Sequence, residues 1–192
     1  MDVKRCSRFL IRQIAAPLTG PNENAPMSAG SSEKSILING GINGTENSKN
    51  ININATAGSS YVVGNVTNGT FYYNGTSNLG SNGSLINGTN SMVLYDTAAN
   101  VTGTGTNIIG ATLNGQYTGI VPAGFTAGIE GENRGNISLG DSSAGLYGIN
   151  GSRLLNKGSV SVGNASIGMS GKGSGSGLRN DGNILIGQAS EG

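Results

Sequence analysis

The residues best suited to chemistry in this chain are two carboxylates, Glu130 and Glu132, which lie two positions apart. On a strand, that spacing places both side chains on the same face, and a pair of carboxylates is what most glycoside hydrolases require. The alternative, which we favour, is that both glutamates lie in the turn before Asn133, solvated and unpaired. We therefore predict that the chain is not an enzyme and has no catalytic, cofactor-binding or metal-binding residue.

Other catalytic and metal-binding patterns are absent or incomplete. The chain contains no histidine, which excludes a Ser-His-Asp triad and an imidazole metal site. Asp96, Asp141 and Asp181 do not form the Gly-rich nonapeptide that binds calcium in some solenoids. The Gly-rich run at 170–177 contains Lys172, but a phosphate-binding loop requires Ser or Thr after the lysine, and Gly173 stands there. We interpret this run as a turn between strands.

The tyrosines are the remaining candidates for binding. They could project from the surface and contact a carbohydrate or a protein, although the interpretation we favour is that several are ordinary strand residues. The six are Tyr61, Tyr72, Tyr73, Tyr95, Tyr117 and Tyr147.

A short sequence phrase that occurs three times near the end of the chain indicates the elements that would position such side chains. It reads NRGNISLG at 133–140, NKGSVSVG at 156–163 and NDGNILIG at 180–187, with offsets of 23 and 24 residues. A period in the twenties is typical of a solenoid, in which each coil buries its apolar face against the next. The third copy stops partway through a coil, so we expect the chain to be a piece of a longer protein.

Alternation within the phrase predicts which side chains face the core. Its fifth and seventh residues are aliphatic in every copy and share one face of a strand. Ser138 and Ser161 between them are expected to point outward, a rule that Leu185 breaks in the last copy. Further inward residues are expected around the following glycine and two positions before each Asn. The predicted inward residues are Ile137, Leu139, Val160, Val162, Ile184 and Ile186, then Ala144, Leu146, Ile167 and Met169, then Leu154 and Leu178.

These three inward segments in 23 or 24 residues predict an all-β fold, a parallel β-helix (β-solenoid). Asn133, Asn156 and Asn180 would then lie one above another and hydrogen-bond along the stack. Glycine every five or six residues disfavours helix, so we expect almost none.

The chain divides into three segments that differ in composition and in the regularity of their repeats. Residues 1–34 are expected to be irregular: their basic start is a poor secretory signal, and Cys6 is the only cysteine. Residues 35–128 contain short aliphatic runs between Asn-Gly turns and predict less regular coils or a cap, with a small β-sandwich as the alternative. Residues 129–192 are the regular repeats. The stretch 116–132 around Pro122 is expected to be a loop or a change of register.

Charge and composition restrict the classes of partner. Charged residues make up only 11% of the chain, and residues 13–192 carry seven bases against nine acids. This balance provides no basic patch, so we predict no binding to nucleic acid. No apolar run approaches the 18 residues of a membrane span, and we expect no direct membrane insertion.

The repeats resemble the passenger region of autotransporter (type V secreted) adhesins, especially the Asn/Gly-rich ones of fusobacteria. The resemblance lies in the N-K-G-S-V-S-V-G phrase followed by S-I-G-M at 166–169 or S-A-G-L at 143–146. The resemblance is strong over about 129–192, whereas over 35–128 it is limited to a similar composition. It implies a right-handed parallel β-helix displayed on the bacterial outer surface or secreted, with a role in adhesion and a translocator β-barrel in the parent protein. The family supplies no catalytic residue.

Three hypotheses for function follow. The first is a non-catalytic structural and adhesive solenoid that binds a host or bacterial surface protein or glycan. The second is a β-helix enzyme that degrades polysaccharide, such as a phage tailspike. The third is a self-assembling β-protein, because the open edge of a solenoid is a template for further strands.

Overall fold

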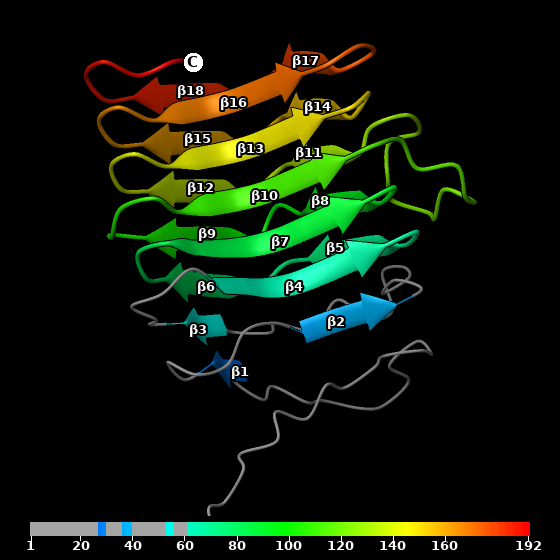
Figure 1. The fold of residues 1–192 in the computed structure, drawn as a ribbon, viewed down its shortest axis with the longest axis horizontal. Helices are drawn as coiled ribbons and strands as arrows, with labels where there is room; N and C mark the ends of the chain where they lie inside the picture. The colour runs from blue at the N-terminus through cyan, green and yellow to red at the C-terminus, as the bar shows by residue number, and fades with distance from the viewer. Residues whose placement is uncertain (1–26, 30–35, 40–52, 56–60) are drawn as a thin grey trace, which may run out of the picture.

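The computed structural model describes residues 27–29, 36–39, 53–55 and 61–192 (Figure 1). Every regular element in these ranges is a strand, and all strand pairs are parallel. The strands form three sheets, which the chain visits in turn as it rises coil by coil. No helix within the described ranges is long and apolar enough to span a membrane. The predicted parallel β-helix is confirmed.

Each sheet collects one strand from each coil. Sheet A contains β1 (Met27–Ala29), β3 (Ile53–Ala55), β6 (Thr76–Leu79), β9 (Asn100–Gly103), β12 (Asn136–Leu139), β15 (Ser159–Val162) and β18 (Asn183–Ile186). Sheet B contains β2 (Ile36–Asn39), β4 (Tyr61–Thr67), β7 (Gly83–Thr89), β10 (Ile109–Asn114), β13 (Ala144–Ile149) and β16 (Ile167–Lys172). Sheet C contains β5 (Thr70–Tyr73), β8 (Met92–Tyr95), β11 (Gly131–Asn133), β14 (Arg153–Asn156) and β17 (Gly177–Asn180).

A coil runs from sheet B through sheet C to sheet A. In Figure 1 the strands of sheet B run from left to right in front, after which the chain passes behind and rises, so the coil is right-handed. The pairing aligns the repeated phrases as their spacing predicts, with Val160 opposite Ile137 and Ile184 opposite Val160. The same three sheets continue through β4 to β10, so the β-sandwich alternative is wrong for residues 61–130.

Inward-facing aliphatic side chains fill the space between the sheets. Ile137, Leu139, Val160 and Val162 are buried in one continuous cluster, which Leu146, Leu154 and Met169 join. Ile184 packs against this cluster, whereas Ile186 and Leu178 on the last described coil remain 37% and 51% exposed. Leu185 is 69% exposed, because it takes the outward position of Ser138 and Ser161.

One predicted set of inward residues is partly wrong. Leu146 and Met169 lie in the core, but Ala144 and Ile167 are only half-buried and lie outside it. The inward position beside them belongs to a glycine. A Cβ on Gly145 would lie 2.7 Å from Val160 Cγ1, and one on Gly168 would lie 2.6 Å from Ile184 Cγ2. Since side chains from sheet A already occupy that space, only glycine fits there.

The predicted asparagine stack is confirmed. Asn133 Nδ2 donates to Asn156 Oδ1 at 2.8 Å, and Asn156 Nδ2 donates to Asn180 Oδ1 at 2.8 Å. The stack ends below Asn133, where Tyr95 occupies the corresponding position and its hydroxyl donates to the Gly110 carbonyl instead. Asn133 Oδ1 is therefore left buried without a hydrogen-bond partner.

The short aliphatic runs of the earlier part of the chain form strands as predicted. They correspond to β2, β3, β4, β5, β8 and β10. Most of residues 1–34, including Cys6 and the basic start, lie outside the described residues, while Met27–Ala29 form β1.

Candidate functional site

One corner of the solenoid carries an insertion. Where the chain passes from sheet B to sheet C, four coils turn through two to four residues, at 68–69, 90–91, 150–152 and 173–176. Between β10 and β11 the chain instead makes a long loop, residues 115–130. We call residues 115–129 the excursion, with Glu130 at its base. It projects beyond the ends of the strands (Figure 1). The expected loop around Pro122 is confirmed, although residues 131 and 132 belong to β11.

The two candidate carboxylates lie at the base of the excursion, and the expectation that they are solvated and unpaired is wrong. Glu130 and Glu132 are 2% and 3% exposed. Both lie on the outer side of sheet C, because Gly131 between them faces the core leucines Leu113 and Leu154. They are buried because the excursion folds back over the outer face of the sheet.

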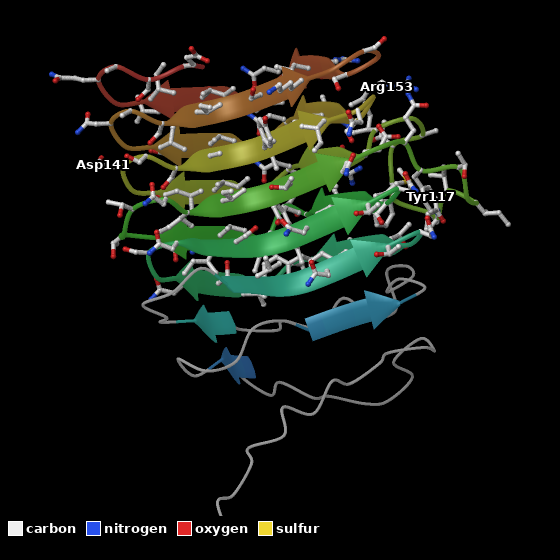
Figure 2. All side chains as sticks on the ribbon, viewed as in Figure 1. Tyr117, Asp141 and Arg153 are labelled. Carbon is white, nitrogen blue, oxygen red and sulfur yellow. The ribbon has the colours of Figure 1, made fainter. Side chains whose placement is uncertain are left out.

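Glu130 joins the excursion to the next coil through backbone amides. Its Oε2 accepts from the Arg153 amide at 2.8 Å, and its Oε1 accepts from the Tyr117 amide at 3.4 Å. Figure 2 shows Tyr117 and Arg153 at the end of the solenoid from which the excursion projects. A buried carboxylate thus binds the first turn of the excursion to β14.

Glu132 is held by two cations. Its Oε1 accepts from Arg134 Nε at 2.8 Å and from Lys157 Nζ at 2.9 Å, and its Oε2 accepts from Arg134 Nη2 at 3.0 Å. Burial by itself would raise the pKa of Glu132, but hydrogen bonds from Arg134, Lys157 and Thr126 outweigh it, and the pKa lies below its usual value. The side chain is therefore an ionised group with its lone pairs in use.

Apolar side chains flank Glu132 on the outer face of sheet C. Leu94 and Leu155 pair with Glu132 on either side in the parallel register. They are 0% and 2% exposed, yet they lie outside the core cluster, whereas their neighbours Val93 and Leu154 lie inside it. The two leucines are therefore buried on the outer side of the wall that the three sheets form, separate from the core cluster.

Arg134 extends the network from the wall into the excursion. Its Nη2 donates to the Gly124 carbonyl at 2.7 Å, and its Nη1 lies 3.9 Å from Asp96 Oδ1. Asp96 also accepts a hydrogen bond from the hydroxyl of Tyr72. Burial, with the hydrogen bond to Asp96, raises the pKa of Tyr72 to about 12.

The tip of the excursion, residues 119–122, is apolar, and hydrogen bonds within the loop hold its shape. Ile120 is 91% exposed and Val121 is 37% exposed. The Tyr117 hydroxyl donates to the Ile120 carbonyl at 3.2 Å, and the Phe125 amide donates to the Pro122 carbonyl at 3.2 Å. The sequence of residues 115–129 contains no charged residue. The site therefore presents an uncharged, hydrogen-bonded loop supported by two buried carboxylates and by the partly exposed Arg134.

The other candidate residues are dispersed. Tyr73 and Tyr95 are buried in the core, Tyr147 is half-buried on β13, and the side chain of Tyr61 lies outside the described part of the chain. Asp141, at the opposite end of the coil from Tyr117 (Figure 2), accepts from the Asn164 amide at 2.7 Å.

The Gly-rich run around Lys172 completes β16 and forms the turn before β17, as interpreted from the sequence. Within the described residues, no three Asp, Glu or Cys side chains are grouped so that they could hold a metal ion.

The sequence reasoning did not identify Arg134 and Lys157 as part of this site. A signal was present, because both occupy the variable position of the N-x-G phrase, one coil apart, and Glu132 precedes Arg134 by two residues. Oppositely charged residues at these positions share the outer face and pair across coils. Comparisons of the chain with protein-family models, with curated proteins and with solved structures gave no match.

Proposed function

We propose that this chain is a structural and adhesive segment of a β-solenoid, of the kind that autotransporter adhesins carry as passengers. It would be displayed on the outer surface of a bacterium or secreted, and it would bind a surface protein or glycan of a host cell or of another bacterium. The observation that carries the proposal is the continuous three-sheet stack, from one corner of which a hydrogen-bonded loop projects beyond the ends of the strands.

The stack is suited to act as a rigid spacer. Parallel strands lie about 4.8 Å apart, so each coil lengthens the rod by roughly that distance. The backbone ladders of the three sheets and the stack from Asn133 to Asn180 resist bending, because every coil is bonded to the next at several points. A rod of this kind keeps a binding surface at a fixed distance from whatever anchors it.

The state of the carboxylate pair supports a non-catalytic role. A glycoside hydrolase needs one carboxyl group that donates a proton and a second that attacks or activates water. Glu130 and Glu132 are both buried, and their oxygens accept hydrogen bonds from backbone amides or cations. Their positions are explained by the support that they give to the excursion.

Adhesion of the full chain to whole cells tests this proposal. Fluorescent beads coated with the chain are expected to bind cultured epithelial cells or Gram-negative bacteria saturably, and free chain should compete. Beads coated with heat-unfolded chain provide the control. Absence of saturable binding to both cell types would contradict the proposal. Release of reducing ends from bacterial or host polysaccharides would instead favour the enzyme hypothesis.

A further inference from the structure

We infer that the tip of the excursion, residues 119–122, is a preformed apolar anchor that inserts into an uncharged recess on a partner protein. This inference rests on the proposed adhesive function and specifies its partner as a protein rather than a glycan or a lipid. Among the large hydrophobic residues of the described structure, Ile120 is exposed to the greatest extent, at 91%.

The exposure of Ile120 differs from that of an ordinary surface hydrophobe because the loop beneath it is held in shape. Within the loop, the Tyr117 hydroxyl donates to the Ile120 carbonyl, and the Ile129 amide donates to the Thr126 carbonyl at 3.2 Å. Gly124 adopts a left-handed conformation with φ +91° that permits the return turn. A loop that is already ordered loses little conformational entropy on binding, which favours affinity.

Attachment to the wall adds to this rigidity. Glu130 accepts from the Tyr117 amide, and Arg134 donates to the Gly124 carbonyl on the opposite limb of the loop. Both limbs of the loop are thus bonded to charged residues at its base.

The chemistry of the tip favours a protein pocket. A glycan site needs polar groups or an open aromatic face, but the tip residues 119–122 are Gly, Ile, Val and Pro, which carry neither a polar nor an aromatic side chain. Attraction to an anionic lipid surface needs free lysine or arginine beside the apolar residues. Residues 115–129 contain neither, and Arg134, which contacts the loop, already donates to Glu132 and to the Gly124 carbonyl. An aliphatic side chain on a neutral loop matches the apolar, fully desolvated pockets that hold the main anchor residues at protein interfaces.

Binding of matched variants to intact epithelial cells and Gram-negative bacteria tests the inference. Ile120→Ser is expected to weaken saturable binding at least tenfold, because burial of an isoleucine side chain corresponds to roughly ten- to a hundredfold in affinity. Leu185→Ser is the control, since it makes the same change at an exposed position on the wall. Ile120→Val should bind within about threefold of the unchanged chain. Tyr117→Phe, which removes the brace at the tip, should weaken binding a few-fold.

Treatment of the cells identifies the class of partner. Protease treatment is expected to abolish binding, whereas periodate oxidation of glycans should leave it intact, and phosphatidylcholine vesicles should not bind the chain. Binding that survives protease but not periodate, or binding to the vesicles, would overturn the inference. Equal binding of Ile120→Ser and the unchanged chain would do the same while leaving the adhesive function in place. If the unchanged chain binds neither cell type, it is the adhesive function itself that fails.

Discussion

Replacement of Glu132 by glutamine tests whether the buried carboxylate supports the fold. Glutamine keeps the size of the side chain but removes the charge that Arg134 and Lys157 contact at 2.8 and 2.9 Å. A hydrogen bond to a charged group contributes about 1.5–3 kcal/mol. Arg134 and Lys157 are 24% and 41% exposed, so water compensates part of the loss. We therefore expect the free energy of unfolding to fall by about 2 kcal/mol.

Urea unfolding followed by far-ultraviolet circular dichroism at pH 7 measures this change. Asp181→Asn is the matched control, because it removes the carboxylate of an ion pair with Arg179 that lies at the exposed surface, and it should leave the urea midpoint unchanged. A loss below about 0.5 kcal/mol for Glu132→Gln would refute the argument, since that is the range of a neutral surface substitution.

The pH dependence provides a second check. The pKa of Glu132 is lower in the folded chain than its usual value of 4.5. Its ionised form therefore stabilises the fold fully above pH 4.5, and this contribution is lost as the pH falls through the folded pKa. The difference in stability between the unchanged chain and Glu132→Gln should be constant above about pH 5.5 and shrink below pH 4.5. A difference that is equally large at pH 3 would show that the charge is not its source.

Three further substitutions test the packing of the wall, each by urea unfolding at pH 7. Asn156→Ala removes the middle of the buried asparagine stack and should lower the free energy of unfolding by about 2–3 kcal/mol. The control, Asn183→Ala, lies at an exposed position and should change it little. Equal effects of the two substitutions would contradict the role of the stack. Gly145→Ala places a Cβ 2.5 Å from the backbone oxygen of Gly168 and should lower the free energy of unfolding by about 1–3 kcal/mol. An unchanged urea midpoint would show that the neighbouring strands move aside at little cost. Tyr95→Phe leaves the Gly110 carbonyl without its donor and should cost about 1–2 kcal/mol; a gain in stability would contradict this.

Much of the wall was predictable because the repeats carry local and long-range information together. A residue that recurs at an interval of 23 or 24 positions contacts its own equivalent in the next coil, so the spacing of Asn133, Asn156 and Asn180 predicted the register as well as the fold. Alternation along one strand then predicted which side chains face inward, as Val160 and Val162 do.

The errors arose where the environment of a residue depends on chain outside its own strand. Ala144 was expected to face the core, but Gly145 faces it instead, and Val160 of sheet A fills the space beside that glycine. Glu130 and Glu132 were expected to be solvated, because nothing in their neighbourhood of the sequence indicates that residues 115–129 fold back over them.

The sequence by itself therefore determined the coil: its period, its inward stripes and its asparagine stack, all of which follow from residues that repeat against copies of themselves. The tertiary structure alone decided what the unrepeated residues do. The excursion has no equivalent in the other coils of residues 61–192, so no periodic pattern could indicate where it lies. Only its contacts with Glu130 and Arg134 place it over the outer face of sheet C, bury the carboxylates and leave Ile120 exposed at the tip.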